Sequence, residues 1–298
     1  MLSLLVVAIA ALPAWAGGAE PAPAKTPTAA DQARADIKAT FGYVPLMMNA
    51  VPDVALPGAW AEFKGLALNP QTALPGKIKD AIGLAVASQI PCKYCVYAHT
   101  QFMMLEGASA EEVKEAIMVA AMDRHWSAIF NGMNLDEKAF KADVDKWIDA
   151  GKKMAAGKMA PPKPMAVTDA KSAMADMQQY FGYVPDFMKR IPEASLPGAW
   201  IEFRDFELGE TALPPKYKDL ISIGIAGQIP CKYCVIADTE FAKADGATDQ
   251  EISEAIMMGA LTRHWSTVLN GAALDEKAFK ADIDKLVKNL KKMMAAKK

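Results

Sequence analysis

The sequence predicts an all-helical protein, built from two tandem copies of one unit with about six helices in each copy. Segments of up to nine residues return 139 or 140 residues later, which indicates a duplicated domain and not a solenoid of short repeats. Strand patterns, such as sustained apolar and polar alternation, are absent from the sequence. The segments Phe41–Pro45, Leu56–Trp60, Gln89–Val96, Arg124–Ser127 and Leu135–Asp143 return as Phe181–Pro185, Leu196–Trp200, Gln228–Val235, Arg263–Ser266 and Leu274–Asp282.

Helix starts are marked at the same place in each copy. Ser109 is followed three residues later by Glu112, and Thr248 is followed in the same way by Glu251. Each pair forms a capping box, in which the two side chains satisfy free backbone amides at the first turn of a helix. Apolar residues at helical spacing follow the first box, so both boxes open one long helix of the repeated unit.

The first residues resemble an export signal. The apolar run Leu2–Leu12 leads into Ala14, Trp15 and Ala16, a small-x-small cleavage pattern. We expect a signal peptide at residues 1–16 and a mature protein in the periplasm, without stable membrane insertion after processing; the alternative is an uncleaved membrane anchor. The other expected boundaries are a flexible leader at 17–30, a first domain at 31–150, a linker at 151–166 and a second domain at 167–298.

The charge composition bears on which kinds of partner the chain can bind. The chain has 33 Lys and Arg residues against 35 Asp and Glu residues, with a formal net charge of −2. A nearly neutral chain gives no reason to expect a nucleic acid or an anionic membrane as partner. The four cysteines form two Cys-x-x-Cys pairs and leave no odd thiol.

The segment around the first cysteine pair carries the clearest chemistry. Cys92, Cys95 and His99 stand on one face of a helix that Pro91 allows to start at Cys92. If this helix folds back antiparallel on the apolar helix before it, Asp80 meets His99 near the thiols. A helix N-terminus stabilises a thiolate, an imidazole can take the thiol proton, and a carboxylate can orient that imidazole.

The second pair, Cys231 and Cys234, repeats this arrangement with one change. Asp219 stands where Asp80 stands in the first copy, but Asp238 replaces the histidine. A carboxylate there repels a thiolate and raises its pKa. The second copy is therefore expected to be the poorer redox site, or a disulfide carrier only.

Other uses of a Cys-x-x-Cys pair stay open at this point. Both pairs together could form a Cys₄ zinc site, if the fold brought them together. Each pair could also close a structural disulfide, although so short a loop constrains the unfolded chain little. A c-type haem is disfavoured, because Val96 and Val235 stand where that motif has histidine.

These residues resemble the alkylhydroperoxidase D-like branch of the carboxymuconolactone decarboxylase superfamily. That branch has an acidic residue, eleven intervening residues, a Cys-x-x-Cys pair and a histidine four residues after the second cysteine. The resemblance covers roughly residues 40–145 and 180–285, and it departs from the family in having aspartate where glutamate is usual.

The resemblance implies a thiol-dependent peroxidase or thiol–disulfide oxidoreductase. Cys95 would attack a hydroperoxide and become a sulfenic acid, Cys92 would resolve it as a disulfide, and Asp80 and His99 would relay the proton. The helix N-terminus alone would favour Cys92 as the activated thiol. The partners implied are a hydroperoxide substrate, a thiol or dithiol reductant protein and further copies of the chain, such as a trimer. We expect no cofactor and no metal ion.

Two rival functions remain. One is a decarboxylase like the enzyme that names the superfamily, although that chemistry does not need a cysteine pair. The other is a non-catalytic binding or assembly module with inert disulfides. The repeated Arg124–Trp126 segment could flank the redox pocket, but a buried histidine beside a packed tryptophan is the favoured interpretation.

Overall fold

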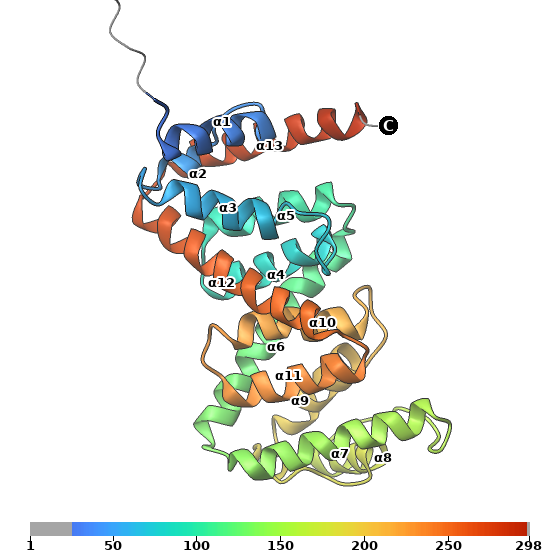
Figure 1. The fold of residues 1–298 in the computed structure, drawn as a ribbon. Helices are drawn as coiled ribbons and strands as arrows, with labels where there is room; N and C mark the ends of the chain where they lie inside the picture. Colours follow the sequence, from blue (N-terminus) through green and yellow to red (C-terminus); the bar gives the residue numbers. More distant parts are fainter. Residues whose placement is uncertain (1–25, 297–298) are drawn as a thin grey trace, which may run out of the picture.

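The computed structural model describes residues 26–296. Within this range every regular element of secondary structure is a helix, as predicted (Figure 1). The first copy contains α1 (Ala29–Phe41), α2 (Leu46–Asn49), α3 (Leu56–Leu66), α4 (Gly76–Gln89), α5 (Lys93–Leu105), α6 (Ala110–Gly132) and α7 (Glu137–Ala155). The second copy contains α8 (Ala170–Phe181), η1 (Met188–Arg190), α9 (Leu196–Glu202), η2 (Phe203–Glu207), α10 (Pro215–Ala226), α11 (Lys232–Ala244), α12 (Asp249–Gly271) and α13 (Glu276–Ala295).

The predicted helix starts are confirmed. Ser109 and Thr248 cap α6 and α12 through the expected capping boxes. The predicted signal peptide lies outside the described residues, and α1 begins at Ala29, inside the segment expected to be a flexible leader. Among the described helices, none combines the length and the apolar character that a membrane span requires.

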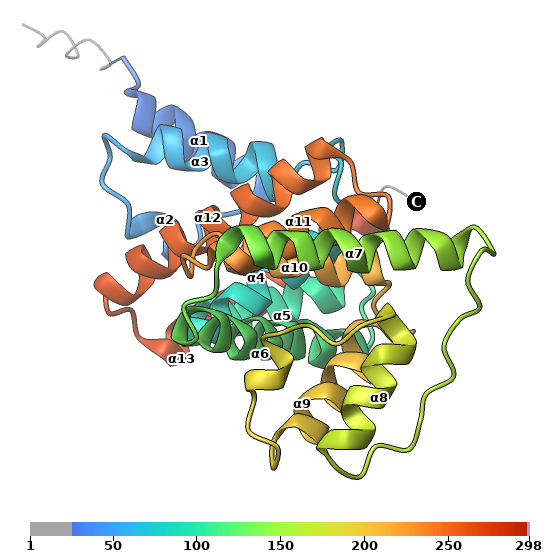
Figure 2. The ribbon, with the colours of Figure 1, turned by 90° about the horizontal axis from the view of Figure 1, so that it is seen from below.

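The two copies exchange their last helices. Helix α13 of the second copy packs on α1, α2 and α5 of the first, and α7 of the first copy packs on α8 and α11 of the second (Figures 1 and 2). In both exchanges, a tyrosine side chain donates a hydrogen bond to a backbone carbonyl just before the exchanged helix. Tyr94 donates to the carbonyl of Leu274 at 2.5 Å, and Tyr233 donates to that of Leu135 at 2.7 Å.

The long helices α4, α6, α10 and α12 form the centre, where the copies meet. Two glycines allow a close approach there. A β-carbon on Gly259 of α12 would overlap the carbonyl of Gly224 on α10, and one on Gly224 would overlap Ile82 of α4. The central helices therefore fix the distance between the two cysteine segments, α5 and α11, which pack on α4 and α10.

Each hydrophobic core is built from both copies. One core combines residues of α1–α5 with residues of α12 and α13, including Trp60, Trp265 and Phe279. The other combines α7 and the second half of α6 with α8–α11, including Trp126 and Trp200. The sequence repeats therefore do not coincide with the packed halves of the molecule. Each packed half contains the last helix of the other copy.

Candidate functional site

The first cysteine pair lies where α4 turns into α5. Helix α5 folds back on α4, and Asp80 Oδ1 lies 2.9 Å from His99 Nδ1. The predicted meeting of carboxylate and imidazole is therefore present in the structure. Burial raises the pKa of Asp80, and the hydrogen bond with His99 opposes that rise.

Asp80, His99 and Cys95 line one cavity of about 430 Å³. Helices of the second copy close its other side through apolar side chains. Those side chains are Met258, Leu261, Trp265, Leu269, Phe279, Leu286, Leu290, Met293 and Met294. A cavity of this size and lining suits an apolar organic molecule, and it brings such a molecule to a thiol and a proton-carrying pair.

The imidazole of His99 rests on a glycine. A β-carbon on Gly83 of α4 would overlap the His99 ring, so only glycine leaves the ring in its place. The second copy has Ser222 at the equivalent position, and Ser222 lines the same cavity as Asp238. This requirement was not visible in the sequence, because a glycine inside an apolar helix does not show which side chain lies against it.

Cys92 is the N-cap of α5 and is fully buried. Its Sγ accepts the backbone N–H of Cys95 at 3.3 Å. A hydrogen bond from the Cys95 thiol lowers the pKa of Cys92 to about 5 against the effect of burial, with help from Ser266 and Asn270 of α12. The same hydrogen bond, together with burial, raises the pKa of Cys95. The pair therefore shares one proton, with the charge on Cys92, and Cys95 faces the cavity.

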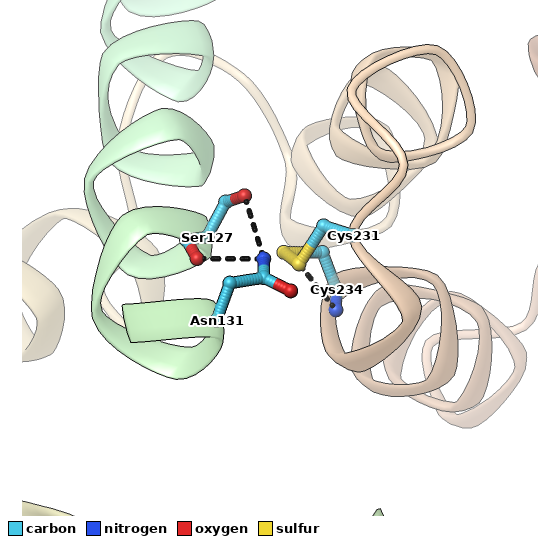
Figure 3. The surroundings of a disulfide bond; sticks show 4 residues. All are labelled: Ser127, Asn131, Cys231 and Cys234. Atoms are coloured by element: carbon cyan, nitrogen blue, oxygen red, sulfur yellow. Dashed lines mark hydrogen bonds between the residues drawn. A yellow bond between two sulfur atoms is a disulfide. The ribbon is translucent and has the colours of Figure 1, made fainter. Parts of the chain in front are cut away.

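The second pair is closed as the disulfide Cys231–Cys234, at the start of α11. Figure 3 shows Ser127 and Asn131 of α6 facing this disulfide from the first copy. Asn131 Nδ2 donates to Ser127 O at 2.8 Å, which fixes the amide in this place. Each cysteine pair thus lies against a serine and an asparagine from the opposite copy.

The cavity beside the second pair differs strongly from the first. It has a volume of about 60 Å³, and Asp219, Asp238 and Cys234 line it. Burial raises the pKa of Asp238 well above its usual range, and neighbouring carboxyl groups, Asp219 among them, add to the rise. Two carboxyl groups, Asp219 and Asp238, therefore stand where the first site has the Asp80–His99 pair.

The Arg124–Trp126 segment and its repeat have a role that the favoured interpretation missed. Trp126 and Trp265 are packed as expected, but each lines the cavity beside the cysteines of the other copy. His125 and His264 are exposed, so the prediction of a buried histidine was wrong. Because each tryptophan turns inward on its helix, the histidine before it points to the surface.

Comparison with known proteins places this geometry in a family. The model of the carboxymuconolactone decarboxylase family matches residues 55–138 and 194–277, one match in each copy. The chain belongs to this family. The matches cover α3–α6 and α9–α12, the helices that carry both cysteine pairs, and leave the exchanged helices α7 and α13 largely outside.

Two further similarities were found. The chain is 30% identical over 70 residues to "Uncharacterized protein 4 in cox locus" of Paracoccus denitrificans, a match that spans 24% of this chain and 63% of that protein. A solved structure from Burkholderia xenovorans LB400, which carries the name of a gamma-carboxymuconolactone decarboxylase subunit, superposes with a TM-score of 0.51 at 17% identity. It covers 87% of this chain and 99% of that one, and shows the fold alone.

The two cysteine pairs of the chain stay separate. Among the described residues, no three His, Cys, Asp or Glu side chains are grouped to hold a metal ion, so the pairs do not form a Cys₄ site. Sequence reasoning missed Gly83, Ser266 and Asn270 at the first site. The repeated Arg-His-Trp-Ser segment was the available signal for Ser266, but only the exchange of helices shows which cysteines it faces.

Proposed function

We propose that the first cavity reduces organic hydroperoxides with the Cys92–Cys95 dithiol. The observation that carries this proposal is the Asp80–His99 hydrogen bond of 2.9 Å inside the cavity that Cys95 lines. It joins a thiol, a proton carrier and room for an apolar substrate in one place.

The reaction balances with the groups present. The Cys95 thiolate attacks the outer peroxide oxygen, the O–O bond breaks, and the alkoxide leaves as an alcohol after taking one proton. Cys95 is then a sulfenic acid. The sulfur of Cys92 attacks it, an S–S bond forms, and the displaced hydroxide takes a proton and leaves as water.

The Asp80–His99 pair supports the first step. Cys95 holds the shared proton in the resting dithiol, so a base has to remove it before Cys95 can attack. With Nδ1 bonded to Asp80, the Nε2 atom of His99 is the ring nitrogen that can exchange a proton in the cavity. The same nitrogen can then return the proton to the leaving alkoxide.

The disulfide has to be reduced again by an outside donor. Two electrons must come from a thiol or dithiol protein, through a mixed disulfide. The export signal proposed from the sequence would place this reductant in the periplasm. The described residues that line the second cavity include no histidine to take the proton of Cys234, which disfavours the same cycle at the second pair.

The test is stopped-flow consumption of an organic hydroperoxide by the reduced chain, with free thiols counted before and after. We expect two thiols to disappear for each hydroperoxide reduced in the fast phase. Cys95→Ser should abolish most of this phase, and the matched variant Cys234→Ser should leave most of it. Survival of the thiols in excess peroxide contradicts the proposal, and equal losses from both variants contradict the assignment to the first site.

A further inference from the structure

The second cavity is lined by four carboxyl groups. Asp123 comes from α6, Glu207 from the π-helical turn η2, Asp219 from α10 and Asp238 from α11. Four separate elements, one of them from the other copy, thus direct an acidic side chain into about 60 Å³.

Three of these carboxyl groups have no acidic counterpart in the first cavity. The repeat aligns Asp123 with Thr262. It aligns Glu207 with Ala67. It also aligns Asp238 with His99, and all three counterparts line the first cavity. Three changes at one place, each to a carboxyl group, indicate that this cavity has a use of its own.

Within residues 26–296, no ion pair joins these carboxyl groups to a basic side chain at close range. Oxygens of Asp123, Glu207 and Asp238 are buried without a hydrogen-bond partner, and Asp123 is only 7% exposed. The nearby ammonium of Lys218 is bonded to the carbonyls of Phe206 and Gly209, and Arg124 lies on an exposed face of α6. Buried unpaired carboxylates are costly unless a cation joins them.

Burial and mutual repulsion both act against the ionised form of these carboxyl groups. Burial first, and then repulsion from Glu207, raises the pKa of Asp123 to about 8. The pKa values of Glu207, Asp219 and Asp238 are also raised, with burial as the main cause in each. Asp245, outside the cavity, adds repulsion at Asp219. A cation bound beside these groups would favour their ionised form and so lower their pKa values.

The rest of the wall is aromatic. Ring faces attract organic cations, and an aromatic cage with carboxylates is a common way to hold an ammonium group. Ammonium N–H groups also supply the donors that the carboxylates lack. The wall contains Trp126, Phe130, Phe140, Trp147, Phe187, Phe203 and Phe241.

We propose that this second cavity binds a small primary alkylammonium ion, with its ammonium beside the unpartnered carboxyl oxygens of Asp123, Glu207 and Asp238 and its alkyl group against the aromatic wall. A volume of about 60 Å³ admits only a few heavy atoms. Methylammonium and ethylammonium are therefore suitable probes. A metal ion fits less well, because within the described part of the chain no three of these groups lie close enough together to hold one. An ammonium N–H group reaches a carboxylate oxygen at about 2.8 Å, which is longer than a metal–oxygen bond and allows a wider spacing of the acids.

The test is a titration of the full chain with methylammonium or ethylammonium chloride, followed by tryptophan fluorescence and calorimetry. Sodium chloride, calcium chloride and manganese chloride serve as comparison salts. We expect saturable binding that is at least about tenfold tighter near pH 8.5 than near pH 6, because the carboxyl groups must be ionised. Absence of saturation at millimolar ammonium overturns the proposal, and so does tighter binding of calcium or manganese.

Two variants locate the site. Asp123→Thr and Glu207→Ala each introduce the residue that the first copy has at that position. We expect each to weaken binding at least about tenfold, since each removes one charge from the cavity, and to leave the peroxide reaction of Cys95 unchanged. Asp123→Asn, which keeps the shape of the side chain, is the second variant if Asp123→Thr does not fold. Unchanged affinity in the folded variants places the ion elsewhere and overturns the proposal.

Discussion

At the scale of single residues, the exchange of His99 for Asp238 is the difference that lies nearest to the chemistry of the two sites. His99 pairs with Asp80, whereas Asp238 shares its cavity with Asp219 and has an unpartnered oxygen. Both positions follow the second cysteine of their pair by four residues. The same position therefore carries a proton carrier, His99, in the first copy and an acid, Asp238, in the second. The side chain at this position therefore decides what each cavity can do.

The first residue-scale prediction concerns the proton shared by Cys92 and Cys95. In a reduced chain with Cys231→Ser and Cys234→Ser, the ultraviolet absorbance of thiolate should rise with pH around a midpoint of about 5. The reason is the hydrogen bond that Cys92 accepts from the Cys95 thiol, which stabilises the charged form and lowers its pKa. The thiolate is thus present above this midpoint and is lost as the pH falls through it.

Two variants identify the group that titrates. Cys92→Ser should remove the acidic transition, and Cys95→Ala should move it to higher pH because the side-chain donor to Cys92 is lost. A midpoint that stays near the ordinary cysteine value of about 8.5 would contradict the shared proton. An acidic transition that survives in Cys92→Ser would assign the charge to Cys95.

The chemistry at this scale was predictable where it depends on one short segment. Asp80, Cys95 and His99 stand on two helices joined by a tight turn, so spacing alone brings them together. Gly83 and Ser266 were not predictable. Gly83 matters through contact with a ring that arrives from α5, and Ser266 comes from the other copy.

At the scale of helices, exchange of α7 and α13 is the feature that the repeat could not reveal. Helical class, helix starts and duplication follow from local patterns and from self-similarity of the chain. The partner of a terminal helix does not, because two similar copies offer α13 two similar docking sites. Residues 135–143 and 274–282 are in fact identical in sequence.

The element-scale prediction concerns the contact that joins α12 to the loop before α4. The buried carboxylate of Glu254 accepts the backbone N–H groups of Ala73 and Leu74, each at 2.8 Å. Glu254→Ala leaves these donors unpaired, so we expect the free energy of unfolding to fall by about 1–3 kcal/mol. Urea unfolding measures the change.

The matched control is Glu111→Ala on α6, which removes an exposed ion pair with Lys114. It should cost less than about 1 kcal/mol. The donors also lower the pKa of Glu254, so the stability that it contributes is lost as the pH falls and the carboxyl group is protonated. A loss in Glu254→Ala as small as that of the control would show that this contact does not hold the copies together.

At the scale of the whole molecule, the cavity beside each cysteine pair needs both copies. The first cavity is closed by Trp265 of α12 and Phe279 of α13, and the second by Trp126 of α6 and Phe140 of α7. The chain therefore resembles a dimer whose two protomers have been joined and have exchanged their last helices. Joining them allowed the two cavities to diverge.

The last prediction follows from this architecture. A fragment of residues 26–166 contains Cys92, Cys95 and His99 but lacks the helices that close their cavity, so a monomer of it has no complete site. Two such fragments can close both cavities by exchanging α7, since α7 starts with the same residues as α13. We therefore expect the fragment to be a dimer, and its rate of hydroperoxide reduction per thiol pair to fall on dilution, while the rate of the full chain stays constant. Sedimentation and stopped-flow measurements over the same concentrations test this, and a fragment that is monomeric yet as fast as the full chain would show that the first site is complete within one copy.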